Sequence, residues 1–162
     1  MSIEKTRLKK DICSALKFPV ICFCLLLLVI QFFRPIFVSG HSMDTTLKDG
    51  QFVIGTRFDS SDLKRGDIVT AEVKRGQEQV KIIKRIIGLP GETIEIKGNE
   101  VFIDGKKLKE DYLLETMNTE DMTVTLKANE YFCMGDNRNR SMDSRKLGPI
   151  PIENLRYKVI IY

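Results

Sequence analysis

The feature that most constrains this chain is a run of 16 uncharged residues near its N-terminus, Phe18–Phe33. An untilted helix needs about 20 apolar residues to cross a bilayer. Ile36–Val38 can extend the run if the intervening Arg34 side chain reaches the lipid–water interface, and a small mismatch in length is tolerated. The pattern therefore predicts one transmembrane helix that anchors the chain, assigned to residues 18–35.

Charge around this run predicts its orientation. Residues 1–17 hold five lysines and arginines and two acidic residues, a net charge of +3 out of +4 for the chain. Lysine and arginine favour the cytoplasmic side, so we expect a cytoplasmic basic tail over 1–17 and an extracytoplasmic domain over 36–162 at the cell membrane. Lipid is then a partner. Nucleic acid is not expected, because binding it needs clustered cations that the rest of the chain lacks.

Two other interpretations of the apolar run stay open. One is a cleavable secretory signal, since Val38, Ser39 and Gly40 offer small or modest residues at a cleavage-like position. Cleavage there would leave Ser42, a candidate nucleophile, almost at the new N-terminus, which favours an anchor. The other is a buried core helix.

The cysteines and the one histidine do not indicate a disulfide framework or a metal site. Three of the four cysteines, Cys13, Cys22 and Cys24, lie at or in the apolar run, and Cys133 stands alone in the rest. No cysteine–histidine cluster has the spacing of metal ligands. We therefore expect no metal and no cofactor.

Beyond Arg34 the chain alternates short apolar runs with turn signals, which predicts a mostly β domain. A hairpin is expected around Gly98-Asn99. Residues 105–122 are rich in charge and are predicted to form an exposed polar excursion. The expected strands are Ile36–Val38, Gln51–Thr56, Asp67–Val73, Gln79–Gly88, Thr93–Lys97, Glu100–Ile103, Met122–Leu126, Glu130–Met134 and Arg156–Ile161.

Lys84 has an unusual setting in one of these strands. Alternation places it in a row with Val80, Ile82 and Ile86, and the opposite face is also partly apolar, so the strand is expected to be central. Burial penalises an ammonium ion and lowers its pKa. A neutral lysine is a usable general base. The ordinary alternative is a lysine that reaches solvent or pairs with a carboxylate.

Four segments resemble, in the same order, the sequence boxes of bacterial type I signal peptidases. Any one of them could arise by chance, but four in order behind a membrane segment are specific. The resemblance covers roughly residues 18–160 and is nearest the short Gram-positive form. It implies the β fold that signal peptidases share with self-cleaving repressors. The segments are Ser39–Leu47 (SGHSMDTTL), Arg65–Val69 (RGDIV), Lys84–Glu92 (KRIIGLPGE) and Gly135–Arg145 (GDNRNRSMDSR).

The resemblance implies a membrane-bound serine endopeptidase that removes signal peptides from exported precursors. Ser42 would be its nucleophile, Lys84 its general base, and the Ser42 backbone N–H a donor to the oxyanion. Ser141 resembles the family serine that hydrogen-bonds and orients the lysine. Three charged residues resemble a cluster that supports the site, Asp143, Arg145 and Arg85.

The resemblance also implies a substrate preference and shows two departures. The family accepts precursors with small residues at positions −1 and −3, and Val38 and Met43 are candidate pocket walls or simply core residues. Gly40 stands where some members have a hydroxyl, so the second oxyanion donor is unassigned. Thr45 replaces the usual proline, which loosens the loop by up to about 1 kcal/mol through unfolded-state entropy.

Three alternatives carry different expectations. A His41–Ser42 dyad is geometrically poor, because adjacent residues of an extended segment point to opposite faces. A self-cleaving repressor shares the serine–lysine pair but should begin with a DNA-binding helix-turn-helix. A catalytically silent scaffold would not need both Ser42 and Lys84, although Thr45 keeps this alternative open.

Overall fold

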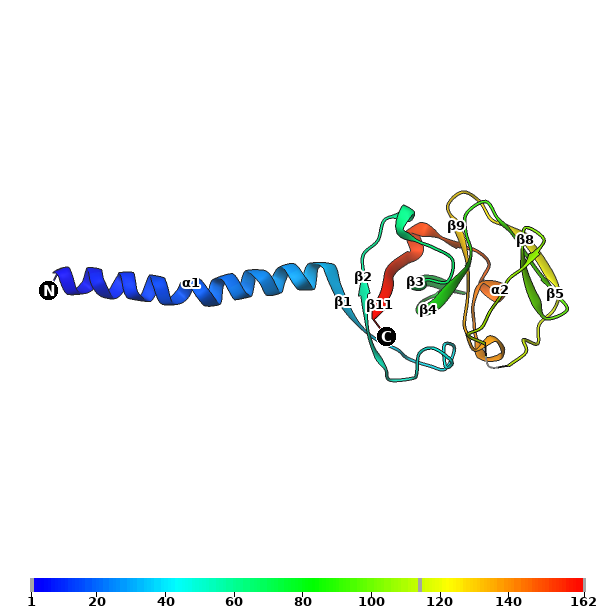
Figure 1. Ribbon diagram of the computed structural model, residues 1–162, viewed down its shortest axis with the longest axis horizontal. Coiled ribbons are helices and arrows are strands. Elements are labelled where there is room, and N and C mark those ends of the chain that lie inside the picture. Colours follow the sequence, from blue (N-terminus) through cyan, green and yellow to red (C-terminus); the bar gives the residue numbers. More distant parts are fainter. Residues whose placement is uncertain (1, 114, 162) are drawn as a thin grey trace. The chain divides into compact units, whose positions relative to one another are not determined.

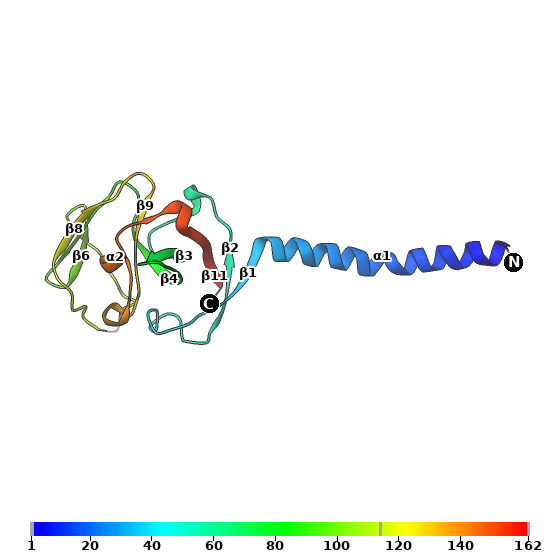
Figure 2. The same cartoon turned by 180° about the vertical axis from the view of Figure 1, so that it is seen from behind.

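The computed structural model describes residues 2–113 and 115–161. Three residues lie outside the described residues: 1 in the predicted tail, 114 in the predicted excursion and 162 at the end of the predicted domain. The chain divides into two compact units, Met1–Arg34 and Pro35–Tyr162. Figure 1 and Figure 2 show the first as a long helix and the second as a β domain.

The first unit consists mainly of helix α1, Ser2–Phe32. Its window Ala15–Phe32 has a mean hydropathy of 2.4 and is long and apolar enough to cross a membrane. The helix ends before the predicted boundary at residue 35, because Pro35 has no N–H to donate and disfavours helical backbone in the residue before it. The predicted extension of the helix through Ile36–Val38 is therefore wrong, and Ile36 and Phe37 lie in strand β1, Phe33–Phe37.

Two antiparallel sheets contain the strands. The larger has seven strands in the order β1-β2-β11-β3-β4-β9-β10, and the smaller has four in the order β7-β6-β5-β8. The strands of the larger sheet are β1 Phe33–Phe37, β2 Phe52–Thr56, β3 Ile68–Arg75, β4 Glu78–Gly88, β9 Glu130–Met134, β10 Ile150–Pro151 and β11 Leu155–Ile161. Those of the smaller sheet are β5 Thr93–Lys97, β6 Glu100–Ile103, β7 Lys106–Lys107 and β8 Met122–Thr125.

The predicted strands are confirmed, with small differences at their ends. Strand β1 begins at Phe33 rather than Ile36, and the two-residue strands β7 and β10 were not predicted because they are too short to alternate. The β5–β6 hairpin pairs Lys97 with Glu100. Gly98 and Asn99 both have positive φ, 58° and 68°, as a type I′ turn requires.

Strand β4 is central, as predicted, because it pairs with β3 on one side and β9 on the other. Val80, Ile82 and Ile86 all pack in one core cluster, which confirms the apolar row that was expected beside Lys84. A second cluster lies between the smaller sheet and the ends of β4 and β9 and includes Phe132. A third includes Met43 and packs beneath the loop that follows β1.

The excursion over residues 105–122 is only partly exposed. Most of its charged side chains are exposed, but Met117 is 2% exposed, and Leu108 and Tyr112 pack against the second cluster. The prediction of an exposed excursion is therefore wrong for these three apolar residues, which pack in or against the second cluster while most of their charged neighbours face solvent.

Short helices also occur among the described residues of this unit. They are η1 Ser60–Asp62, η2 Arg138–Arg140, α2 Ser144–Leu147 and η3 Ile152–Asn154.

Candidate active site

Ser42 lies in the loop that joins β1 to β2. The base of this loop is closed by the Val38 N–H, which donates to Gln51 O at 2.9 Å. After Ser42, the backbone makes one helical turn in which the Leu47 N–H donates to Met43 O at 2.7 Å. Met43 and Leu47 are both fully buried. The buried side chains of Met43 and Leu47 thus hold the segment that follows Ser42 in place.

Lys84 meets Ser42 from the centre of the larger sheet. Its Nζ donates to Ser42 Oγ at 2.6 Å and to the Ile83 carbonyl at 2.8 Å, and the residue is only 4% exposed. Burial lowers the pKa of Lys84 from 10.5 to about 8, although Asp143, Cys133 and Asp136 act in the opposite direction. The sequence expectation of a buried lysine with a lowered pKa is confirmed, and its hydroxyl partner is Ser42.

His41 faces away from this pair. Its side chain is 60% exposed, and its Nδ1 lies 3.0 Å from Asp44 Oδ2. The geometry agrees with the expectation that His41 does not form a dyad with Ser42. Val38 and Met43, the candidate pocket walls, are 3% and 0% exposed and pack in the third cluster, so they are core residues.

Asp143 and Arg145 form a buried pair at the start of α2. Arg145 donates to Asp143 through Nε at 2.9 Å and through Nη2 at 2.8 Å, and the Gly135 N–H donates to Asp143 Oδ2 at 3.0 Å. Burial alone would raise the pKa of Asp143, but these donors lower it below its usual value. The carboxylate therefore stays charged and ties Gly135 to α2.

Ser141 lies beside Gly135. Its Oγ is buried and faces the Asp143 carboxylate, whose pKa it helps to lower. The two hydrogen bonds that the described residues give for Lys84 Nζ go to Ile83 O and Ser42 Oγ, so the orienting role of Ser141 stays a prediction. A Cβ added to Gly135 would lie 2.3 Å from Ser141 Oγ and 2.4 Å from Ser42 O. Only glycine lets these segments come together so closely.

Arg85, the residue after the lysine, makes a second buried pair that joins three segments. Its Nε donates to Asp136 Oδ1 at 2.8 Å, and its Nη2 to Asp136 Oδ2 at 2.6 Å. Nη2 also donates to Thr46 Oγ1 at 3.0 Å, while the Thr46 hydroxyl donates to Asp136 Oδ2 at 2.5 Å. Asp136 thereby links β4 to the loop that carries Ser42.

The backbone of the same segment also holds Ser42, because the Asn137 N–H donates to Ser42 O at 3.0 Å. Sequence reasoning missed Asp136, Asn137 and Thr46 as site residues. The available signal was their position inside the segments Gly135–Arg145 and Ser39–Leu47, but nothing in the spacing shows which polar residues turn inward.

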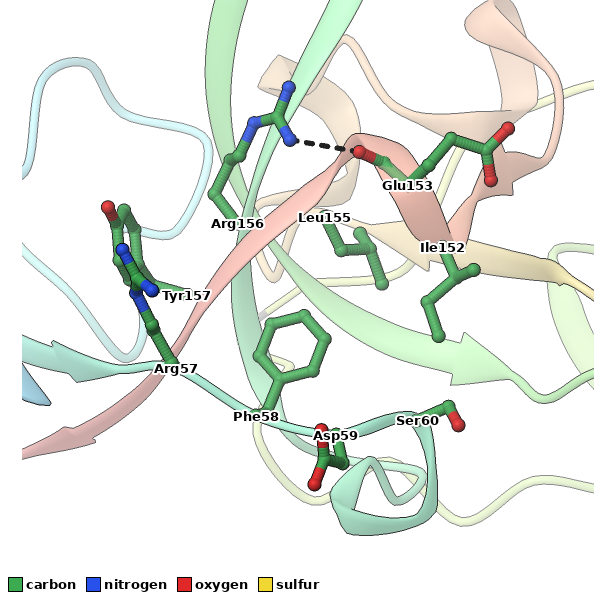
Figure 3. Close-up of a pocket in the computed structure, with 9 residues that line it drawn as sticks. All are labelled: Arg57, Phe58, Asp59, Ser60, Ile152, Glu153, Leu155, Arg156 and Tyr157. Carbon is green, nitrogen blue, oxygen red and sulfur yellow. Dashed lines mark hydrogen bonds between the residues drawn. The ribbon is translucent and has the colours of Figure 1, made fainter.

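A cavity of about 530 Å³ lies apart from this site, between η1, η3 and β11. Figure 3 shows its apolar side, formed by Phe58, Ile152 and Leu155, and the contact of Arg156 with the Glu153 carbonyl. It contains none of the predicted site residues. Within the part of the chain that the structure describes, no cluster of three or more His, Cys, Asp or Glu side chains could hold a metal ion.

Comparison with known proteins assigns this chain to a family. The family model described as "Signal peptidase, peptidase S26" matches residues 12–162. The chain belongs to the S26 signal peptidase family. It is therefore an enzyme, a hydrolase of the signal peptidase class, as the sequence resemblance implied.

Individual relatives of this family are similar over most of their length. Signal peptidase I of Bacillus licheniformis is 40% identical, in an alignment that covers 90% of this chain and 84% of the relative. Signal peptidase I S of Bacillus subtilis is 41% identical with the same coverage. The crystal structure of a signal peptidase I from Enterococcus faecalis matches with a TM-score of 0.55 and 32% identity, over 61% of this chain and 97% of that one. The mostly β fold expected for a signal peptidase is thus confirmed.

Proposed function

We propose that this S26 family member removes signal peptides from secretory precursors with Ser42 as nucleophile and Lys84 as general base. One observation carries the proposal: Lys84 Nζ lies 2.6 Å from Ser42 Oγ in a buried position where the pKa of the lysine falls to about 8. A base must lie within hydrogen-bond reach of the proton that it accepts, and its pKa should be near the working pH. Lys84 meets both requirements.

The first half of the reaction forms an acyl-enzyme. Neutral Lys84 accepts the proton of Ser42 Oγ as that oxygen attacks the carbonyl carbon after the signal peptide's last residue. The tetrahedral intermediate then expels the amine of the mature protein, which receives the proton from Lys84. In the second half, Lys84 accepts a proton from water, hydroxide attacks the ester, and the proton returns to Ser42 Oγ.

The oxyanion of the tetrahedral intermediate needs hydrogen-bond donors that are already in place. The Ser42 backbone N–H suits this role, because it donates to no other described residue. Gly40 has φ of 93°, a conformation that glycine adopts readily, and its N–H is already bonded to Asp49 Oδ1 at 2.7 Å. The Gly40 N–H is thus occupied, and a second donor stays unassigned.

The pH dependence of cleavage tests the lysine base. We expect kcat/KM to rise about tenfold per pH unit on the acidic side and to level off above about pH 8, because protonated Lys84 cannot accept the Ser42 proton and its pKa is lowered to about 8. Initial rates with a precursor peptide between pH 5 and 10 measure this. Lys81→Ala, at an exposed lysine of the same strand, serves as the control and should keep the wild-type profile. A wild-type profile that is already flat from about pH 6 upward would contradict a lysine base.

We also propose that α1 crosses the membrane with residues 1–17 in the cytoplasm and the β domain outside. The support is the apolar window Ala15–Phe32 and the net charge of +3 over residues 1–17, at the N-terminal end of that window, which favours the cytoplasmic side. The catalytic domain would then act at the outer surface, on precursors with small residues at −1 and −3.

Protease protection tests this orientation. In right-side-out vesicles, we expect added protease to degrade the β domain while an N-terminal tag on the full chain stays intact until detergent is added. The tag should be degraded at once in inside-out vesicles. Degradation of the tag in intact right-side-out vesicles would show the opposite orientation.

A further inference from the structure

The excursion that follows the smaller sheet's hairpin reaches back to two buried arginines near the site. The Tyr112 ring centroid lies 4.2 Å from Arg85 Cζ. Glu110 pairs with Arg138, whose Nη1 lies 3.0 Å from Glu110 Oε2. The Arg138 and Glu110 side chains are only 1% and 8% exposed. Both contacts are therefore largely shielded from water. Such interactions are strongest when water is excluded.

Tyr112 and Glu110 also hold each other, since the Tyr112 hydroxyl donates to the Glu110 carboxylate. Burial raises the pKa of Tyr112 far above its usual value, and the neighbouring Glu110 raises it further. The phenol thus stays protonated in the pH range of any assay and remains a donor. The ring and the carboxylate form one unit that faces both guanidinium groups.

The two arginines continue from this unit to the nucleophile. Arg85 holds the Asp136 carboxylate, and Arg138 Nε donates to Gly135 O at 3.1 Å. Asn137, which follows Asp136 in the chain, donates its N–H to Ser42 O at 3.0 Å. A continuous series of contacts therefore leads from the excursion to the backbone that carries the nucleophilic hydroxyl.

We propose that Tyr112 and Glu110 are positioning residues for the signal peptidase reaction, because they hold Arg85 and Arg138 against residues 135–137 and so set where Ser42 lies relative to Lys84. The proposal rests on the Ser42–Lys84 function proposed above. Neither residue touches the reacting atoms. Their effect acts through placement, to which the rate is sensitive because a misplacement of about 1 Å can cost about 100-fold.

The test compares Tyr112→Leu, Tyr112→Phe and Glu110→Gln with wild type, using the full chain in detergent micelles and a synthetic precursor peptide. We expect Tyr112→Leu to lower kcat about tenfold, which corresponds to about 1.4 kcal/mol, with KM changed less than about twofold. Tyr112→Phe keeps the ring over Arg85 and should retain most of the rate. Glu110→Gln keeps the shape but loses the charge that pairs with Arg138, and should fall between the two.

A pH profile separates positioning from general destabilisation. Lys84 is faced by Asp143, Cys133 and Asp136, and Arg85 neutralises the last of these. If Arg85 moves away from Asp136 in Tyr112→Leu, the freed negative charge raises the pKa of Lys84. The acidic limb of kcat/KM should then move to higher pH in this variant.

The matched control is Leu108→Ala, which removes packing from the same excursion and the same core cluster but no contact with a guanidinium group. The proposal is overturned if Leu108→Ala, at an equal loss of Tm, lowers kcat as much as Tyr112→Leu, or if Tyr112→Leu leaves both kcat and the acidic limb unchanged. Ser42→Ala is assayed in parallel. Cleavage by that variant would overturn the proposed nucleophile itself, whatever the Tyr112 variants do.

Discussion

Replacing Ser42 with alanine should abolish precursor cleavage, with kcat lowered about 10⁴-fold or more. The variant lacks the hydroxyl oxygen that Lys84 Nζ contacts, so no acyl-enzyme can form. Lys84→Ala should lose activity to a similar degree, because the Ser42 hydroxyl then has no base within reach. The double variant should be little worse than either single one, since a nucleophile and its base act as a unit.

The measurement is release of signal peptide from a secretory precursor by the purified full chain in detergent. Ser60→Ala and Lys81→Ala are matched controls, because both residues are exposed and lie outside the site; we expect their rates within about twofold of wild type. Cleavage that survives either Ser42→Ala or Lys84→Ala would rule out the dyad and would favour another nucleophile or base.

Replacing Asp136 with alanine should lower the free energy of unfolding by about 3–5 kcal/mol, the usual effect of removing one partner from a buried ion pair. Asp136 and Arg85 side chains are 1% and 9% exposed. The variant would remove the carboxylate that accepts two hydrogen bonds from the buried Arg85 guanidinium. It would also release Thr46 from the carboxylate, so we expect cleavage activity to fall as well.

Denaturant-induced unfolding of the full chain measures this effect. The control is Glu72→Ala, which removes a carboxylate from Arg156 at the surface, where the arginine side chain is 43% exposed; we expect a change of about 0–1 kcal/mol there. Adding Arg85→Leu to Asp136→Ala should recover part of the lost stability, because it also removes the buried cation. A loss no larger than that of Glu72→Ala would show that the Asp136–Arg85 pair is not needed for stability.

Much of the fold was predictable from local patterns. The apolar run predicted the long helix, and alternation with turn signals predicted the strands, because both depend on residues that are close in sequence. The alternation of Gln79–Gly88 also predicted a buried Lys84. The end of the helix was predicted less well. Apolar residues after Arg34 suggested a longer helix, whereas Pro35 disfavours helical backbone there.

The site residues also differ in whether a local sequence pattern could reveal them. The Ser42 and Lys84 boxes were recognisable as short segments, and the exclusion of His41 followed from adjacency alone. Ser141 was assigned a hydrogen bond to Lys84 by resemblance, and the structure places it beside Gly135, so this role stays a prediction. Asp136, Tyr112 and Glu110 carried no local signal, because a charged or aromatic residue in a polar segment looks the same whether it faces solvent or a buried arginine.

The sequence by itself determined the apolar helix, the order of the strands along the chain, and the presence of a lysine whose neighbours remove it from water. Only the tertiary structure decided that this lysine meets Ser42, 42 positions away, and that Asp136 ties Arg85 to the loop that carries Ser42. The reason is physical. Alternation and turns act within a few residues, whereas a buried charge is stabilised by whichever partner the packed sheets bring to it.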